Sequence, residues 1–227
     1  MALSAVGTDR LTPMTVIGFL HTSDAHRSVF EALVGEIDPG SHTVTVVDEE
    51  LLDRARRTDP TDPAVVEVVH RRLVELDGLG AASIICTCST LGGVAESVGD
   101  ELGLDVVRVD RAMAERAVAI GGRVVVLAAL ESTVAPTCEL IEASADQQAA
   151  SVAVVSAVID GAWPRFEAGD SDGYHALVAD AIERVGGDAD VVVLAQASMA
   201  PAVDLVDAVV PVLSSPRAAI TAMLGDA

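Results

Sequence analysis

The chain has 227 residues, of which 51% are hydrophobic and only 2% aromatic, so its core must be built from Val, Ala, Leu and Ile. Fourteen basic residues face 35 acidic ones for a formal net charge of −21, and every basic residue is Arg. Without Lys there is no Schiff-base lysine and no Walker A lysine, and a polybasic surface for nucleic acid or membranes is not expected. The acidic balance fits an adaptation for solubility or high salt.

The cysteines and the N-terminus indicate a cytoplasmic protein. Cys86, Cys88 and Cys138 are too few for a disulfide framework, and they fit a reducing compartment. No metal site is expected, because the Cys-x-Cys pair has no neighbouring His or further Cys to complete four ligands. Residues 1–13 are interpreted as a loose tail, and no apolar run approaches the roughly 18 residues of a membrane span.

Short β-branched runs alternate with longer helical patterns along the chain. The predicted strands are Val16–Leu20, Thr43–Val47, Ser83–Thr87, Asp105–Val109, Arg123–Leu127, Val152–Val155, Val191–Leu194 and Val209–Val212. The predicted helices include Ala64–Leu76, Leu91–Glu101, Arg111–Ile120, Pro136–Ala145 and Tyr174–Val185. Strand–helix alternation predicts right-handed βαβ units, and the spacing divides the strands into two groups of four. We therefore predict an α/β fold of two similar lobes, each with a four-stranded, mostly parallel sheet flanked by helices.

The two halves of the chain also resemble each other. The stretch Ser83–Leu91 aligns in sequence with Val191–Met199, so Cys88 corresponds to Gln196, 108 residues later. A second pairing sets the stretch Val16–Thr22 near Val124–Ala129. The predicted first lobe comprises residues 14–103 plus 212–227, with the last helix packed back on it, and the second comprises residues 104–211, with a cleft between them.

Polar and reactive residues follow several of the strands. Cys88, Gln196, His21 and the Glu131–Thr133 turn all stand at the carboxyl ends of strands, where open α/β sheets bind ligands. Cys88 also begins a helix, whose amide groups favour a thiolate and bind carboxylates. Position alone leaves two states open for this thiol: a base with a lowered pKa, or the buried, inert state that is common for free cysteine.

Three stretches resemble a known family. Ile84–Thr90 looks like the first cysteine motif of the aspartate/glutamate/hydantoin racemase superfamily, with Ser89 in place of an Asn. Leu194–Met199 matches the frame of the second cysteine motif, with Gln196 where the cysteine belongs. Val126–Thr133 is similar to a Leu-Ala-Thr turn of that family, although Ala129 replaces the Thr. The superfamily also includes maleate isomerases and arylmalonate decarboxylases.

The resemblance implies cofactor-independent chemistry beside a carboxylate or carbonyl of a small acid. In such enzymes two cysteines exchange a proton on opposite faces of a carbon, and donors around the carboxylate hold the enediolate, so no cofactor is needed. By resemblance Cys88 is catalytic, and the residues expected around the substrate are Ser89, Thr90, Ala197, Ser198, Thr22, Thr133 and His21.

The departure at Gln196 leaves the reaction open, because an amide does not titrate in the useful range. The chain is then a racemase- or isomerase-like enzyme with another second acid or base, for which His21 is the candidate, or a one-thiol decarboxylase or lyase. It is alternatively an isomerase in which Cys88 attacks an unsaturated diacid and Gln196 orients the substrate. The alternative that is not an enzyme is a non-catalytic small-acid-binding protein. The expected partner is a small carboxylate-bearing molecule, not nucleic acid or membrane; homo-oligomerisation is left open.

Other polar residues are interpreted as structural. Asp110 is expected to cap the following helix. Trp163 and Tyr174 flank a polar Asp-Gly stretch that is expected to form a loop near the cleft or the surface. Three further histidines, His42, His70 and His175, are expected to lie away from the cleft.

Overall fold

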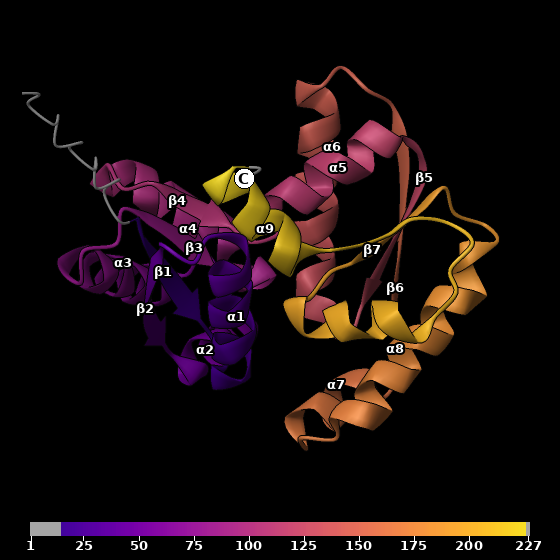
Figure 1. The fold of residues 1–227 in the computed structure, drawn as a ribbon, viewed down its shortest axis with the longest axis horizontal. Helices are drawn as coiled ribbons and strands as arrows, with labels where there is room; N and C mark the ends of the chain where they lie inside the picture. Colours follow the sequence, from indigo (N-terminus) through magenta and orange to yellow (C-terminus); the bar gives the residue numbers. More distant parts are fainter. Residues whose placement is uncertain (1–14, 226–227) are drawn as a thin grey trace, which may run out of the picture.

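A computed structural model describes residues 15–225. Two four-stranded sheets, both wholly parallel, form the two lobes (Figure 1). The first sheet has the order β2-β1-β3-β4 and contains β1 (Val16–His21), β2 (His42–Val47), β3 (Ser83–Cys86) and β4 (Val106–Arg108). The second has the order β6-β5-β7-β8 and contains β5 (Gly122–Ala128), β6 (Val152–Val158), β7 (Val191–Leu194) and β8 (Val212–Ser214). The predicted fold class is confirmed, while the predicted tail lies outside the described residues.

Nine α-helices and three 3₁₀ turns connect the strands in residues 15–225. The helices are α1 (Arg27–Ile37), α2 (Glu49–Arg57), α3 (Pro63–Gly78), α4 (Ser89–Leu102), α5 (Arg111–Ile120), α6 (Val134–Gln147), α7 (Ala162–Glu167), α8 (Ser171–Gly186) and α9 (Ser215–Leu224). The 3₁₀ turns are η1 (Asp24–His26), η2 (Glu131–Thr133) and η3 (Ala197–Leu205). None of the helices in this part of the chain combines the length and hydrophobicity that a membrane crossing requires.

Each sheet is buried on both faces, as expected of a parallel sheet with apolar central strands. In the first sheet alternate strand residues pack against α3 and α4 on one face and against α1 and α9 on the other. In the second sheet one face packs against α5 and α6, and the other against α8 and η3. The central strand β7 is buried at every position, which matches its unbroken Val-Val-Val-Leu sequence.

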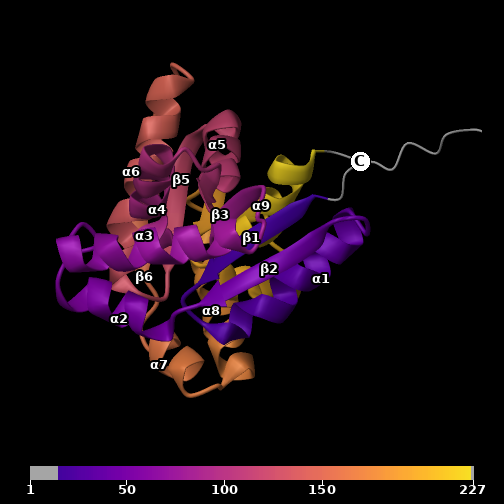
Figure 2. The same ribbon diagram turned by 90° about the vertical axis from the view of Figure 1, so that its left-hand side faces the viewer.

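Two helices cross between the lobes. α5 follows β4 of the first sheet yet packs on the second, and α9 follows β8 of the second sheet yet packs on the first, between the two halves in Figure 1. Turning the molecule by 90° shows α9 beside β1 and β3 (Figure 2). The pairings set β4 in the sheet of β1 and β8 in the sheet of β5, so the sheets divide the chain later than the predicted boundaries near residues 103 and 211. The domain ranges themselves stay a prediction.

The last predicted strand is wrong in position. The structure begins β8 at Val212 rather than at Val209, whose side chain is 81% exposed. The reason is Pro211, which has no N–H to donate to a strand ladder; its carbonyl instead accepts a hydrogen bond from the Val192 N–H at 2.9 Å.

Candidate active site

The four central strands of the two sheets end at one cleft. β1, β3, β5 and β7 run into helical turns there, and Ser23, Cys88, Leu130 and Gln196 are the residues that precede those turns. The first backbone N–H groups of such turns have no partner within the helix, so they form an anion-binding surface. A cavity of about 360 Å³ lies between them and takes residues from both lobes.

Eight of the nine residues predicted for the site line this cavity. They are Cys88, Gln196, Thr22, Ser89, Thr90, Thr133, Ala197 and Ser198. The sequence pattern predicted that these residues lie together, because the carboxyl ends of neighbouring parallel strands share one edge of a sheet. Their roles in binding or chemistry stay a prediction.

Cys88 is the residue before α4, in extended conformation with φ −110° and ψ 110°, and its side chain is buried in the cavity wall. Burial raises the pKa of the Cys88 thiol. Hydrogen bonds from the Thr22 hydroxyl and from the backbone N–H groups of Leu91 and Thr90 oppose the rise without cancelling it. Of the two states left open for this thiol, the raised pKa favours the buried one. The helix start does stabilise the thiolate, but the desolvation of a buried charge is larger.

Gln196 occupies the equivalent position before η3, with φ −128° and ψ 140°. Its Oε1 accepts a hydrogen bond of 2.6 Å from the Ala129 N–H, and its Nε2 has no partner among residues 15–225. Strand register shows that Ala129 mirrors Thr22: Ile17 pairs with Ser83 as Val124 pairs with Val191. The two halves thus match with a shift of 107 residues at this strand rather than the expected 108.

The first turn of α4 is tied to the second lobe by two hydroxyl groups. Ser89 Oγ donates to the Ala195 carbonyl at 2.9 Å, directly before Gln196. Thr90 Oγ1 lies 3.3 Å from both the carbonyl and the hydroxyl of Ser132. These contacts fix the separation of Cys88 and Gln196, so the cleft has a defined width.

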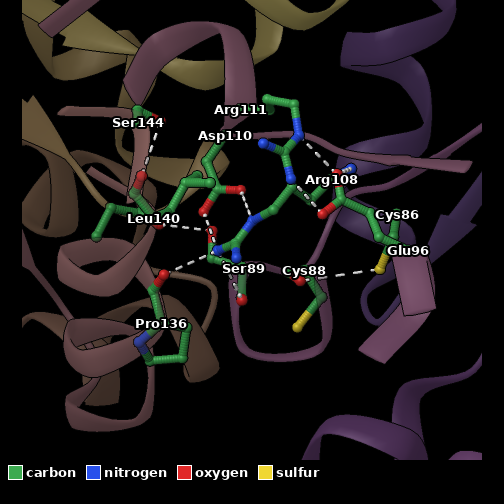
Figure 3. A network of polar contacts seen from close by, with 11 residues as sticks. Cys86, Cys88, Ser89, Glu96, Arg108, Asp110, Arg111, Pro136, Leu140 and Ser144 are labelled. Atoms are coloured by element: carbon green, nitrogen blue, oxygen red, sulfur yellow. Dashed lines mark hydrogen bonds and ion pairs between the residues drawn. The ribbon is translucent and has the colours of Figure 1, made fainter. Parts of the chain in front are cut away.

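A buried ion pair between Arg108 and Asp110 contacts the first turn of α4 (Figure 3). Arg108 donates from Nε and Nη2 to the two carboxylate oxygens of Asp110 at 2.6 and 2.9 Å. Its Nη2 also reaches the carbonyls of Ser89 and Pro136, at 3.4 and 3.1 Å, and so joins α4 to α6. Gly92 makes room for this side chain, since a Cβ there would lie 2.7 Å from the Cβ of Arg108.

The network corrects the interpretation of Asp110. Asp110 does precede α5, but its side chain makes no capping hydrogen bond and binds Arg108 instead. Next to it, Arg111 pairs with Glu96 of α4 through Nη2 at 2.5 Å. The Cys86 thiol donates to the Cys88 carbonyl, with 3.8 Å between Sγ and the oxygen (Figure 3).

His21 lies behind the cavity rather than in its lining. Its Nδ1 is hydrogen-bonded to the Thr87 hydroxyl at 2.7 Å, and its ring stacks on Phe19 at 5.5 Å between centroids. Burial, with the nearby charges of His26 and Arg27, lowers the pKa of His21 to about 3. His21 is not among the residues that line the cavity, because the last residue of a strand points to the core when its neighbour points to the cleft. Its expected contact with the substrate stays a prediction.

Ser198 is held by two residues that were not expected at the site. The Tyr174 hydroxyl lies 2.8 Å from Ser198 Oγ, and His175 Nε2 lies 3.0 Å from the Ser198 carbonyl. Both belong to α8, which confirms the helix predicted from Tyr174, although the structure begins it at Ser171. His175 does not line the cavity, but it contacts the backbone of Ser198, which does. Helix periodicity alone does not reveal that the first turn of α8 runs along η3.

The sequence pattern missed the outer part of the cavity. His26 lines it, burial lowers the pKa of His26 to about 4, and neither ring nitrogen has a hydrogen-bond partner among residues 15–225. Glu49 and Asp53 come from α2. The signal was present, because α2 follows the carboxyl end of β2. In residues 15–225 no three His, Cys, Asp or Glu side chains are grouped as metal ligands.

The racemase resemblance is tested by comparison with known proteins. A family model described as Asp/Glu/Hydantoin racemase matches residues 15–223. The chain belongs to this family. The predicted family is thereby confirmed, and the members of the Asp/Glu/hydantoin racemase family are enzymes that act on small acids. No curated protein matches the chain in sequence.

Solved structures share the fold of this racemase-family chain. An aspartate racemase homologue from Pyrococcus horikoshii OT3 matches with a TM-score of 0.70 and 15% identity, covering 93% of this chain and 98% of the other. An aspartate racemase from Picrophilus torridus gives 0.69 and 16%, covering 92% and 93%. An arylmalonate decarboxylase gives 0.57 and 18%, covering 93% and 92%. At these identities the likeness concerns the fold alone.

Proposed function

We propose that this protein is a cofactor-independent racemase- or isomerase-like enzyme that acts on a carbon beside the carboxylate or carbonyl of a small acid. The observation that carries the proposal is a single thiol, Cys88, at the buried end of a cleft between two lobes of the racemase fold. Helix starts from both lobes surround that thiol, so the site combines a proton-transferring group with donors for an anion.

Each part of the site has a role in this chemistry. The backbone N–H groups and hydroxyls at Ser89, Thr90, Ala197 and Ser198 bind the carboxylate and stabilise the enediolate as negative charge moves onto its oxygens. Cys88 exchanges a proton with the adjacent carbon. Gln196 lies on the opposite side of the substrate from Cys88. Its Oε1 accepts a hydrogen bond from the Ala129 N–H, and its Nε2 donates to the substrate.

A one-thiol decarboxylase or lyase is the second candidate, and the raised pKa of Cys88 favours it. A buried neutral thiol is a better proton donor than base, and loss of CO₂ generates a carbanion that needs only a donor. Since Gln196 does not titrate, the proton then arrives from one face, and the product has one configuration.

An incubation in D₂O, followed by NMR, tests both candidates. The panel comprises amino acids, hydantoins, malonates and maleate, and it reports α-proton exchange as well as net conversion. An enzyme exchanges or converts at least one member, and Cys88→Ala abolishes this while Cys138→Ala, which lies outside the cavity lining, retains it. A panel that gives thermal stabilisation by a ligand with no exchange or conversion contradicts the proposal and indicates a small-acid-binding protein.

A further inference from the structure

The cavity has a buried end and an open end. Cys88 and Gln196 are no more than 9% exposed, whereas the side chains of Asp53 and Glu167 are 60% and 56% exposed. A small acid whose reacting carbon lies at Cys88 therefore directs its substituent toward the open end. The residues at that end determine which substituent fits.

Aromatic rings form the wall near the open end. Trp163 and Phe166 of α7 both line the cavity and stack on each other at 5.1 Å between ring centroids, with an interplanar angle of 30°. Tyr174 lies behind them, 5.4 Å from Phe166, and Leu52 of α2 contributes an apolar side chain from the first lobe. The chain has five Phe, Tyr and Trp residues in all, so three of them gather here. Such a wall offers contact area to an apolar or aromatic group.

The charged residues at the open end are acidic. Glu49, Asp53 and Glu167 line the cavity, and none of the described residues that line it is Arg. Arg56 offsets part of this charge from outside the lining, since its Nη1 lies 3.5 Å from Asp53 and 3.9 Å from Glu167, and its guanidinium stacks over Trp163. Three carboxylates against one guanidinium leave an excess of negative charge, which repels an anionic substituent.

We propose that the substrate of this site is a small acid whose substituent is apolar, preferably aromatic, and carries no carboxylate, and that Trp163, Phe166 and the three rim carboxylates set this specificity. The inference rests on the proposed function only in assigning the cavity to the substrate. A dicarboxylic acid bound with one carboxylate at Ser89 and Ala197 turns its second carboxylate toward the aromatic wall and the acidic rim. Both the lost contact and the repulsion weaken its binding.

Trp163 provides the assay, because it is the single Trp of the chain and lines the cavity. The probes are phenylacetate and succinate, which share a carboxymethyl group and differ in carrying a phenyl ring or a second carboxylate. Titration of the full chain, followed by Trp fluorescence, is expected to give at least tenfold tighter binding of phenylacetate at low ionic strength. Added salt narrows the difference by strengthening succinate binding alone, because exposed charges are screened and apolar contacts are not.

Variants separate the two contributions, with affinities measured by calorimetry. Trp163→Leu retains an apolar side chain and weakens phenylacetate binding about fivefold to tenfold while succinate changes less than twofold. Glu167→Gln and Asp53→Asn tighten succinate binding twofold or more. Val209→Ala, exposed and outside the cavity lining, changes neither probe and serves as the control.

Two results would contradict the proposed specificity. Succinate binding as tight as phenylacetate, or a loss of both probes to the same extent in Trp163→Leu, shows that the wall and rim do not select the substituent. Binding needs no turnover, so selective binding without proton exchange leaves this inference standing and refutes the proposed function. Proton exchange on aspartate or glutamate, with no preference for an aromatic substituent, supports the proposed function and refutes this inference.

Discussion

The ion pair between Arg108 and Asp110 connects the stability of the fold with the geometry at Cys88. Both side chains are almost wholly buried, at 7% and 0% exposure, and the guanidinium donates to both carboxylate oxygens. Arg108→Met keeps the length of the side chain but removes its charge. It leaves the Asp110 carboxylate buried without a partner, and it removes the link from Ser89 to Pro136.

The expected loss is large for a single substitution. Removal of one partner of a buried pair costs about 3–5 kcal/mol, because the remaining charge is desolvated without compensation. For a chain of this length that corresponds to a fall in melting temperature of roughly 6–20 °C. The double variant Arg108→Met/Asp110→Leu leaves no buried charge, so it recovers most of the loss.

Urea denaturation of the single and double variants measures these values. The matched control is Arg217→Met, which removes the exposed pair of Arg217 with Glu36, where the side chains are 57% and 61% exposed. That control is expected to leave the midpoint almost unchanged, since exposed pairs contribute little. An equal effect of Arg108→Met and Arg217→Met, at unchanged m-value, refutes the assignment of a supporting role to the buried pair.

Three further predictions concern titration and the second face of the site. Burial lowers the pKa of His21 to about 3 and of His26 to about 4, so both stay neutral in the folded chain while the unfolded chain takes up protons near pH 6.5. Stability therefore falls as the pH drops below about 6.5, by roughly 1.4 kcal/mol per pH unit for each His, and His26→Phe flattens this slope in urea titrations between pH 6 and 4. The raised pKa of Cys88 predicts slow alkylation by iodoacetamide at pH 7 and a rate that still climbs above pH 9, followed by mass spectrometry; a plateau below pH 8 is inconsistent with it. Gln196→Cys supplies a second thiol and is expected to increase inversion of an enantiopure substrate relative to retention, as measured by chiral chromatography; an unchanged ratio indicates that Gln196 does not face the reacting carbon.

Periodicity and spacing predicted most of the fold. The unbroken apolar runs identified seven of the eight strands closely, because both faces of a parallel sheet are buried. β8 was misplaced because Pro211 interrupts an apolar run that otherwise reads as one strand. The shift of one residue between the halves at β1 and β5 was also missed, since register depends on partners that lie far along the chain.

The residues at the inner end of the cavity were predicted, whereas those at its outer end were missed. Cys88 and Gln196 follow strands, and the sheet topology brings strand ends together whatever the loops do. By contrast, Trp163 reaches the cavity only through the packing of the short helix α7 against α8. The direction of the Cys88 pKa stayed open, because the sequence reveals the helix start but not the depth of burial. His21 and His26 differ by five positions, and only the direction of each side chain distinguishes core from cavity.

The most direct test of the account is the α-carbon exchange of each enantiomer of an identified substrate in D₂O, measured by NMR for the full chain and for Cys88→Ser. One thiol facing an amide predicts that deuterium enters from one face, so one enantiomer exchanges much faster than the other, and that the variant shows no exchange. Equal exchange of both enantiomers with inversion, or full exchange in Cys88→Ser, contradicts the assignment of Cys88 as the single proton-transferring group.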